Sequence, residues 1–161
     1  MRAVIARPAG KFAMPAFLEG VVEPPTYARW LARKAVAHVR RDRSRGRSCT
    51  VAEYKLAIHA AVVACGGRDA YTGEALDWHL LSRYRNDASR DGRHAYRSGF
   101  ALLPSVDHEI ASDAASGFRI CAWRTNDAKN DLAPDAFVAL CARVLAHAGW
   151  RLQPPAEDVP C

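Results

Sequence analysis

The sequence predicts a single α+β domain, and three observations support this fold class. Apolar residues recur at helical spacing in two stretches of the N-terminal half. Two short apolar runs follow, LLPSVDH and FRICAW, and both are typical of strands. Two further helical patterns come after the second run. A chain of 161 residues, of which 50% are hydrophobic, is long enough to bury one core.

We divide the chain into four regions within this one domain, residues 1–161. Residues 1–25 form an irregular lead that contains four prolines. Residues 26–66 form a basic helical region, and residues 67–148 hold the strands and the later helices. Residues 149–161, with three further prolines, form an extended tail.

The first helix is predicted to begin at Thr26, a plausible N-cap after two prolines. Its apolar stripe is predicted to consist of Tyr27, Trp30, Leu31, Ala35, His38 and Val39. Basic side chains surround this stripe, so the helix is amphipathic and basic. Tyr27 and Trp30 either belong to the core or stack on nucleic-acid bases.

The second helix is predicted to begin after Thr50, because Thr50 and Glu53 have the spacing of a capping box. Gly66 or Gly67 would end it. An apolar face is predicted to pack on the first helix, and it consists of Leu56, Ala60, Val63 and Ala64. His59, within the same pattern, is expected to be a structural histidine.

The remaining elements form a ββα unit and a last helix. Thr72-Gly73 is a turn signal that predicts a hairpin before the first strand. The first strand ends at Asp107-His108, and the helix after the second strand is predicted to place Asn126 near its first turn. The last helix begins at about Pro134. Its stripe is expected to close the core and consists of Phe137, Leu140, Cys141, Val144 and Leu145.

The net charge of +6 is concentrated at the N-terminus. Residues 1–48 hold eleven Lys or Arg against three acids, a balance of +8, so the rest of the chain carries −2. A local positive patch attracts polyanions and makes their binding dependent on salt. The pattern favours nucleic acid as partner, although an Arg-rich helix is also compatible with a merely solvated face.

Asp107, His108 and Asn126 together have the chemistry of a metal-dependent nuclease site. A phosphodiester is hydrolysed when one side chain takes a proton from water while a divalent cation holds the phosphate. His108 is the candidate base, and Asp107 and Asn126 offer the oxygen ligands that Mg²⁺ prefers. Taken singly, His108 is equally compatible with a surface or core histidine, and Asn126 with an N-cap.

The order of the strands, with DH ending the first and N-x-x-K in the following helix, resembles the HNH (ββα-metal) endonuclease family over residues 67–144. The resemblance implies an HNH-like core with two N-terminal helices and a C-terminal helix packed around it. It implies that Asp107 and Asn126 bind the metal, that His108 is the general base and that Lys129 assists catalysis or neutralises a neighbouring acid. Asn126 replaces the family's final histidine, or Asn130 takes that role, and Asp127 is a possible further ligand.

The resemblance also implies one divalent cation, for which Mg²⁺ is favoured over Mn²⁺ or another divalent ion. No CxxC pair is present, so no structural zinc is expected.

Five singly scattered cysteines indicate reduced thiols, with Cys121 and Cys141 in the core. No apolar stretch approaches the roughly 20 residues of a membrane span, and a cytoplasmic location is expected.

The expected function is metal-dependent hydrolysis of nucleic acid, with DNA favoured over RNA as partner. The nucleic-acid-binding side chains are predicted to be Arg33, Lys34, Arg40, Arg41, Arg43, Arg93, Arg97 and Arg124. The alternative is a non-catalytic nucleic-acid-binding protein that retains the fold. A third possibility is a small interaction module whose arginines serve only solubility.

Overall fold

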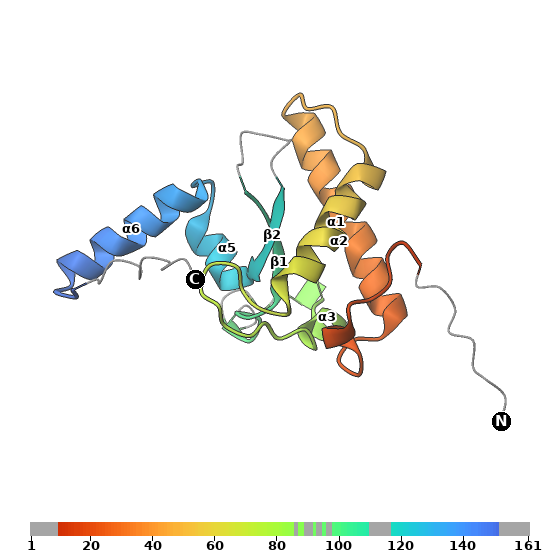
Figure 1. The fold of residues 1–161 in the computed structure, drawn as a ribbon, viewed down its shortest axis with the longest axis horizontal. Helices are drawn as coiled ribbons and strands as arrows, with labels where there is room; N and C mark the ends of the chain where they lie inside the picture. Colours follow the sequence, from red (N-terminus) through yellow and green to blue (C-terminus); the bar gives the residue numbers. More distant parts are fainter. Residues whose placement is uncertain are drawn as a thin grey trace, which may run out of the picture.

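The computed structural model describes residues 10–85, 87–88, 92, 95, 98–109 and 117–151, and over these residues the fold is α+β (Figure 1). A short 3-10 turn, η1, precedes two long helices, and a two-stranded sheet with its following helix lies beside them. The elements are η1 (Ala16–Leu18), α1 (Pro24–Ser44), α2 (Val51–Cys65), α3 (Leu80–Arg83), β1 (Pro104–His108), β2 (Phe118–Ala122), α5 (Trp123–Lys129) and α6 (Pro134–His147).

Helix α1 buries the whole predicted stripe, from Tyr27 to Val39, against α2 and the sheet. Its predicted N-cap was wrong by three residues, because Glu23 is the N-cap and the two prolines occupy the first turn. Proline suits those positions, since the first amide groups of a helix have no partner within it. Thr26 therefore lies inside the first turn and accepts a hydrogen bond from Arg29 at 3.1 Å.

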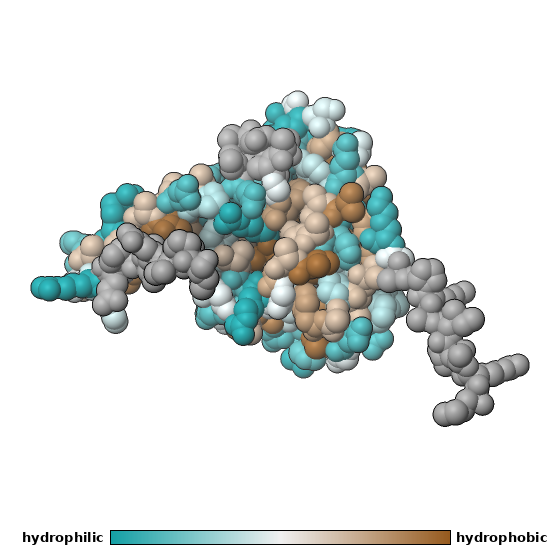
Figure 2. Space-filling view, viewed as in Figure 1, coloured by the Kyte–Doolittle hydropathy of each residue, from teal (hydrophilic) through white to brown (hydrophobic). Residues whose placement is uncertain are grey.

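Helix α2 begins and ends as predicted. The Thr50 hydroxyl accepts from the Glu53 amide, the Glu53 carboxylate accepts from the Thr50 amide, and Gly66 closes the helix with a φ of 53°. Its predicted apolar face was wrong: Leu56, Ala60, Val63 and Ala64 are exposed, and Tyr54, Ile58 and Val62 are buried instead. Apolar residues cover most sides of this helix, so periodicity could not distinguish the buried side. Figure 2 shows apolar surface over α2.

The sheet is antiparallel, with Ser105 opposite Cys121 and Asp107 opposite Arg119. The predicted hairpin around Thr72-Gly73 is reduced to one bridge between Arg68 and Ala75. Buried Asp69 holds this turn to the sheet, because its carboxylate accepts from the amides of Tyr71 at 2.7 Å and of Ala122 at 2.7 Å. The turn therefore places Tyr71 against the sheet.

Helix α6 begins at Pro134 as predicted but does not close the core. None of its residues is buried, and Val138, Val144 and Cys141 are exposed, so the prediction of a buried stripe was wrong. It lies to one side of the molecule (Figure 1), where Phe137 packs edge-on against Tyr71 at 5.7 Å between ring centroids. Cys121, in contrast, is fully buried as predicted.

No helix among the described residues combines the length and the apolar character needed to cross a membrane.

Candidate functional site

A polar cavity of about 260 Å³ lies between the C-terminal half of α1, the end of β1 and α5. Asp107, His108 and Asn126, which were singled out from the sequence, all line it, as do Asp127 and Asn130. The remaining lining residues are Arg41, Arg45, Val106 and Asp131. The fold thus brings residues from three separate segments to one hollow in which acids and amides face two arginines.

Strand β1 delivers Asp107 and His108 in different directions, because neighbouring side chains of a strand point to opposite faces of the sheet. Asp107 meets Tyr71 and Lys129, whereas His108 meets Asp42 of α1. All five residues of β1 are buried. Both side chains reach the same cavity only because they lie at the end of the strand.

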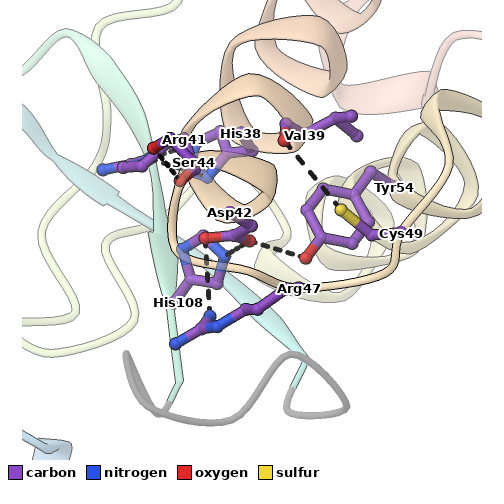
Figure 3. A network of polar contacts seen from close by, with 9 residues as sticks. All are labelled: His38, Val39, Arg41, Asp42, Ser44, Arg47, Cys49, Tyr54 and His108. Carbon is purple, nitrogen blue, oxygen red and sulfur yellow. Dashed lines mark hydrogen bonds and ion pairs between the residues drawn. The ribbon is translucent and has the colours of Figure 1, made fainter.

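His108 forms a dyad with the buried carboxylate of Asp42. The distance from His108 Nε2 to Asp42 Oδ2 is 2.8 Å, and Asp42 lies between the imidazole and the Tyr54 hydroxyl, which donates to the same oxygen at 2.6 Å (Figure 3). The Arg47 guanidinium approaches the other oxygen at 3.4 Å. This carboxylate fixes the orientation of the His108 ring.

The contact of His108 Nε2 with Asp42, together with the pKa shifts of the two groups, indicates which nitrogen carries the proton. Desolvation acts to raise the pKa of Asp42, but hydrogen bonds from Tyr54 and His108 outweigh it, so the pKa lies below the usual value. Burial lowers the pKa of His108, against the opposing effect of Asp42. At neutral pH an ionised Asp42 therefore accepts from Nε2–H of a neutral His108, and Nδ1 keeps the lone pair.

Asp107 has a partner on each carboxylate oxygen. Tyr71 donates its hydroxyl proton to Oδ2 at 2.6 Å, and the Lys129 ammonium lies 3.1 Å from Oδ1. Lys129 is only 1% exposed, so its charge is directed to Asp107 and away from solvent. Of the two roles considered for Lys129, this contact fits neutralisation of Asp107.

Helix α5 carries the amide side chains of the site. It begins at Trp123, so Asn126 lies one turn inside it, and the reading of Asn126 as an N-cap was wrong. Its amide nitrogen donates to Ser105 Oγ at 3.0 Å, so that contact does not use the carbonyl oxygen. Asn130 ends α5 with a φ of 52° and a ψ of −128°, a positive-φ backbone that residues other than glycine rarely adopt.

The donor set suits a divalent cation that binds together with its substrate. Among the described residues, no group of three or more His, Cys, Asp or Glu side chains could hold a metal ion. Asp107 and the amide oxygen of Asn126 are nonetheless hard ligands in one cavity, and Mg²⁺ is commonly bound by one or two carboxylates plus substrate phosphates. A carboxylate has about four lone-pair sites, so the contacts with Tyr71 and Lys129 still leave ligating capacity on Asp107.

The predicted binding arginines fall into different environments. Arg41 lines the site cavity, Arg40 is exposed on α1, and Arg33 and Lys34 line a second cavity. Arg43 instead donates to the Cys49 carbonyl, at 2.8 Å, and so supports the turn after α1.

Of the other three predicted arginines, only Arg124 is among the described residues, and it does not line the site cavity. Arg124 forms an exposed ion pair with Glu74. Arg93 and Arg97 lie outside the described residues.

Three residues of the site were missed from the sequence: Asp42, Tyr71 as a partner of Asp107, and Arg45. Asp42 had a signal, because it is the only acid between Thr26 and Arg47 in a stretch rich in arginine. A lone buried acid in such a stretch needs a partner, which here is a histidine 66 positions later. Nothing in the sequence pattern indicates that pairing.

Comparisons with protein-family models, curated proteins and solved structures return no match for this chain.

Proposed function

We propose that this protein is a metal-dependent endonuclease of the HNH (ββα-metal) type that hydrolyses phosphodiester bonds in nucleic acid. The observation that supports this most directly is the single polar cavity in which Asp107 and His108 from β1 face Asn126 from α5. Each residue type in it has a role in phosphodiester hydrolysis.

In this proposal His108 is the general base. Its Nδ1 lone pair takes a proton from the attacking water, and Asp42 stabilises the imidazolium that results through Nε2–H. A base must be neutral to accept a proton, and burial keeps the pKa of His108 below its ordinary value. Cleavage is therefore expected to fall only at a pH below the usual histidine range, about 6.5.

Asp107 and Asn126 would hold the cation, for which Mg²⁺ is favoured and Mn²⁺ is the alternative. The cation would supply charge stabilisation at the scissile phosphate and at the departing oxygen. Lys129 and Tyr71 hold the Asp107 carboxylate in place, so both are positioning residues. Asp127 and Asn130 line the same cavity and offer further oxygen atoms.

Arg41 and Arg45 would bind the phosphate backbone at the α1 side of the cavity. Both are exposed and line the cavity together with residues of β1 and α5. Guanidinium groups bind phosphates through paired hydrogen bonds. Such pairs both attract the nucleic-acid strand and fix its position. DNA is favoured over RNA as substrate, and the phosphate chemistry is common to both.

The first test is plasmid cleavage with Mg²⁺ or Mn²⁺, with and without a chelator. We expect cleavage that the chelator abolishes, and His108→Ala should remove it while a gel shift at low salt still shows DNA binding. His147→Ala is the matched control, because His147 is exposed on α6 and far from the cavity lining. Cleavage by His108→Ala at the wild-type rate would show that His108 is not the base.

One observation favours a second candidate, a nucleic-acid-binding protein without catalysis. Lys129 already compensates Asp107, at 3.1 Å in a buried contact, as would be expected if no cation were needed there. This candidate predicts a salt-dependent gel shift with no cleavage in either metal. The third possibility, a small interaction module, predicts no salt-dependent retention on DNA.

A further inference from the structure

A second cavity, of about 360 Å³, lies next to the first. Its volume is within the range of about 300–1,000 Å³ that is usual for small-molecule pockets. Aromatic and cationic side chains share its wall, and the six that matter here are Trp30, Arg33, Lys34, Tyr84, Ser105 and Trp123.

The two cavities follow one another along the same three elements. On β1, Pro104 and Ser105 line the second cavity, and the next three residues line the first. On α5, Trp123 belongs to the second and Asn126 to the first, and the hydrogen bond from Asn126 to Ser105 lies where they meet. A strand bound at the first cavity can therefore continue directly into the second.

Helix α1 supplies cations to both cavities from one side. Lys34 and Arg41 are seven residues apart, which is two helical turns and about 10 Å along the axis. Neighbouring nucleotides of a single strand can cover that distance. The side chains thus form a continuous positive edge along the row of cavities.

The cations of the second cavity lack an acidic partner. Among the described residues, no carboxylate forms an ion pair with Arg33 or Lys34. Burial, together with repulsion from Arg33 and Arg41, lowers the pKa of Lys34 to about 8. A bound anion would relieve both effects, so the charge pattern points to an anionic ligand.

Aromatic side chains from α1, from the segment after α3 and from α5 also line this cavity. Tyr84 and Trp123 meet edge to face at 5.4 Å between ring centroids, and both are half-buried. Trp30 is 3% exposed and lines the cavity from within the core. Nucleobases stack on such side chains, whereas a base inside a duplex is already stacked and paired.

We infer that the second cavity binds an unpaired nucleobase of the substrate, next to the nucleotide whose phosphate lies in the first cavity. The base contacts Trp123 and Tyr84, and its own phosphate lies on Arg33 and Lys34. This inference rests on the proposed function for the position of the base relative to the scissile phosphate. Binding of the base itself needs neither a metal nor cleavage. The substrate is then a single strand, or a duplex from which one base is extruded.

The probe is a single-stranded thymidine oligonucleotide with one central 2-aminopurine, whose fluorescence is quenched by stacking. We expect quenching when the protein is added to the single strand in chelator, and weaker binding to the same sequence as a duplex, whose base must first leave its pair. An oligonucleotide with an abasic position in place of the 2-aminopurine should bind about tenfold or more weakly, the usual effect of losing one stacked base. This comparison uses the wild-type chain and does not depend on whether a variant folds.

Two pairs of variants place the base. Ala37→Leu fills the second cavity, whereas Val36→Leu places the same leucine side chain at an exposed neighbouring position that lines neither cavity. Arg33→Gln removes a cavity cation, whereas Arg29→Gln removes one from the same helix outside both cavities. Ala37→Leu should abolish the quenching, and Arg33→Gln should reduce the salt dependence of binding by the equivalent of about one phosphate contact. Both controls should behave as wild type.

The outcomes separate this inference from the proposed function. Equal binding of the normal and abasic strands, or equal quenching by Ala37→Leu and Val36→Leu, would overturn the base site. Quenching without any metal-dependent cleavage would support the base site and contradict the nuclease. Metal-dependent cleavage without quenching would support the nuclease and contradict the base site.

Discussion

Asp42 is a fully buried carboxylate that contacts three side chains at once, two through hydrogen bonds and one through an ion pair. Tyr54, His108 and Arg47 approach it from three different segments of the chain. A buried charge without its partners costs several kcal/mol, so each partner depends on the carboxylate and the carboxylate depends on them. One residue therefore links the candidate base to the packing of α1 on α2.

We predict that Asp42→Asn lowers both the free energy of unfolding and the rate of cleavage. The amide keeps the size of the side chain but removes the charge that Tyr54 and His108 contact, so a loss of about 2–4 kcal/mol is expected. Urea unfolding measures the first effect and plasmid cleavage the second. Asp135→Asn, at an exposed position of α6, is the control. An unfolding free energy within about 0.5 kcal/mol of wild type would contradict the prediction.

Helices α1, α2 and α6 show how far periodicity predicts an element and its orientation. In α1 polar residues surround a single apolar stripe, and the buried side was predicted correctly. In α2 and α6 apolar residues occupy several sides, so the existence and ends of the helices could be predicted but the buried side could not. The capping box and the glycine stop of α2 were predictable because they depend on neighbouring residues alone, whereas the predicted N-cap of α1 was wrong.

The N-cap threonine of α2 can be compared with Thr26, a threonine inside the first turn of α1. Thr50→Ala removes the hydroxyl that accepts from the Glu53 amide and donates to the Glu53 carboxylate, and it should cost about 1 kcal/mol. Thr26→Ala should cost clearly less, because Thr26 is not the N-cap of α1. Urea unfolding of the two variants measures the difference. Equal losses would mean that the hydroxyl of Thr50 does not stabilise its helix.

For the whole molecule, the sequence predicted the α+β class and the order of α1, α2, β1, β2, α5 and α6, but not η1 or α3. It also predicted that Asp107, His108 and Asn126 lie together. These predictions follow from local pattern and from the ends of strands and helices. The contacts of Asp42 with His108 and of Tyr71 with Asp107 could not be predicted in this way, because both residues reach the site from outside the ββα segment. Tertiary packing brings those segments in, and no short spacing in the sequence records it.

The stability of the whole molecule should depend on pH through His38 and His108. Burial lowers the pKa of both, and for His38 repulsion from Arg41 and His108 lowers it further. The unfolded chain takes up these protons at about pH 6.5, but the folded chain does so only at lower pH. Stability is therefore fully present above about pH 6.5 and is lost as the pH falls below it.

The expected slope is up to about 1.4 kcal/mol per pH unit for each of the two histidines. Urea unfolding between about pH 7 and about pH 5 measures it. His38→Gln should reduce the slope, whereas His79→Gln, at an exposed position, should leave it unchanged. A wild-type unfolding free energy that does not change over this interval would show that neither histidine is held neutral by the fold.

The pairing of Asp42 with His108 also sets an order of events during synthesis. The two residues are 66 positions apart. At the usual rate of about 5–20 residues per second, the ribosome makes Asp42 several seconds before its partner. During that interval α1 and α2 can pair through Tyr54, but the charge of Asp42 still lacks its histidine. If His108 is the general base, as we propose, the nascent N-terminal half is inactive until β1 has emerged.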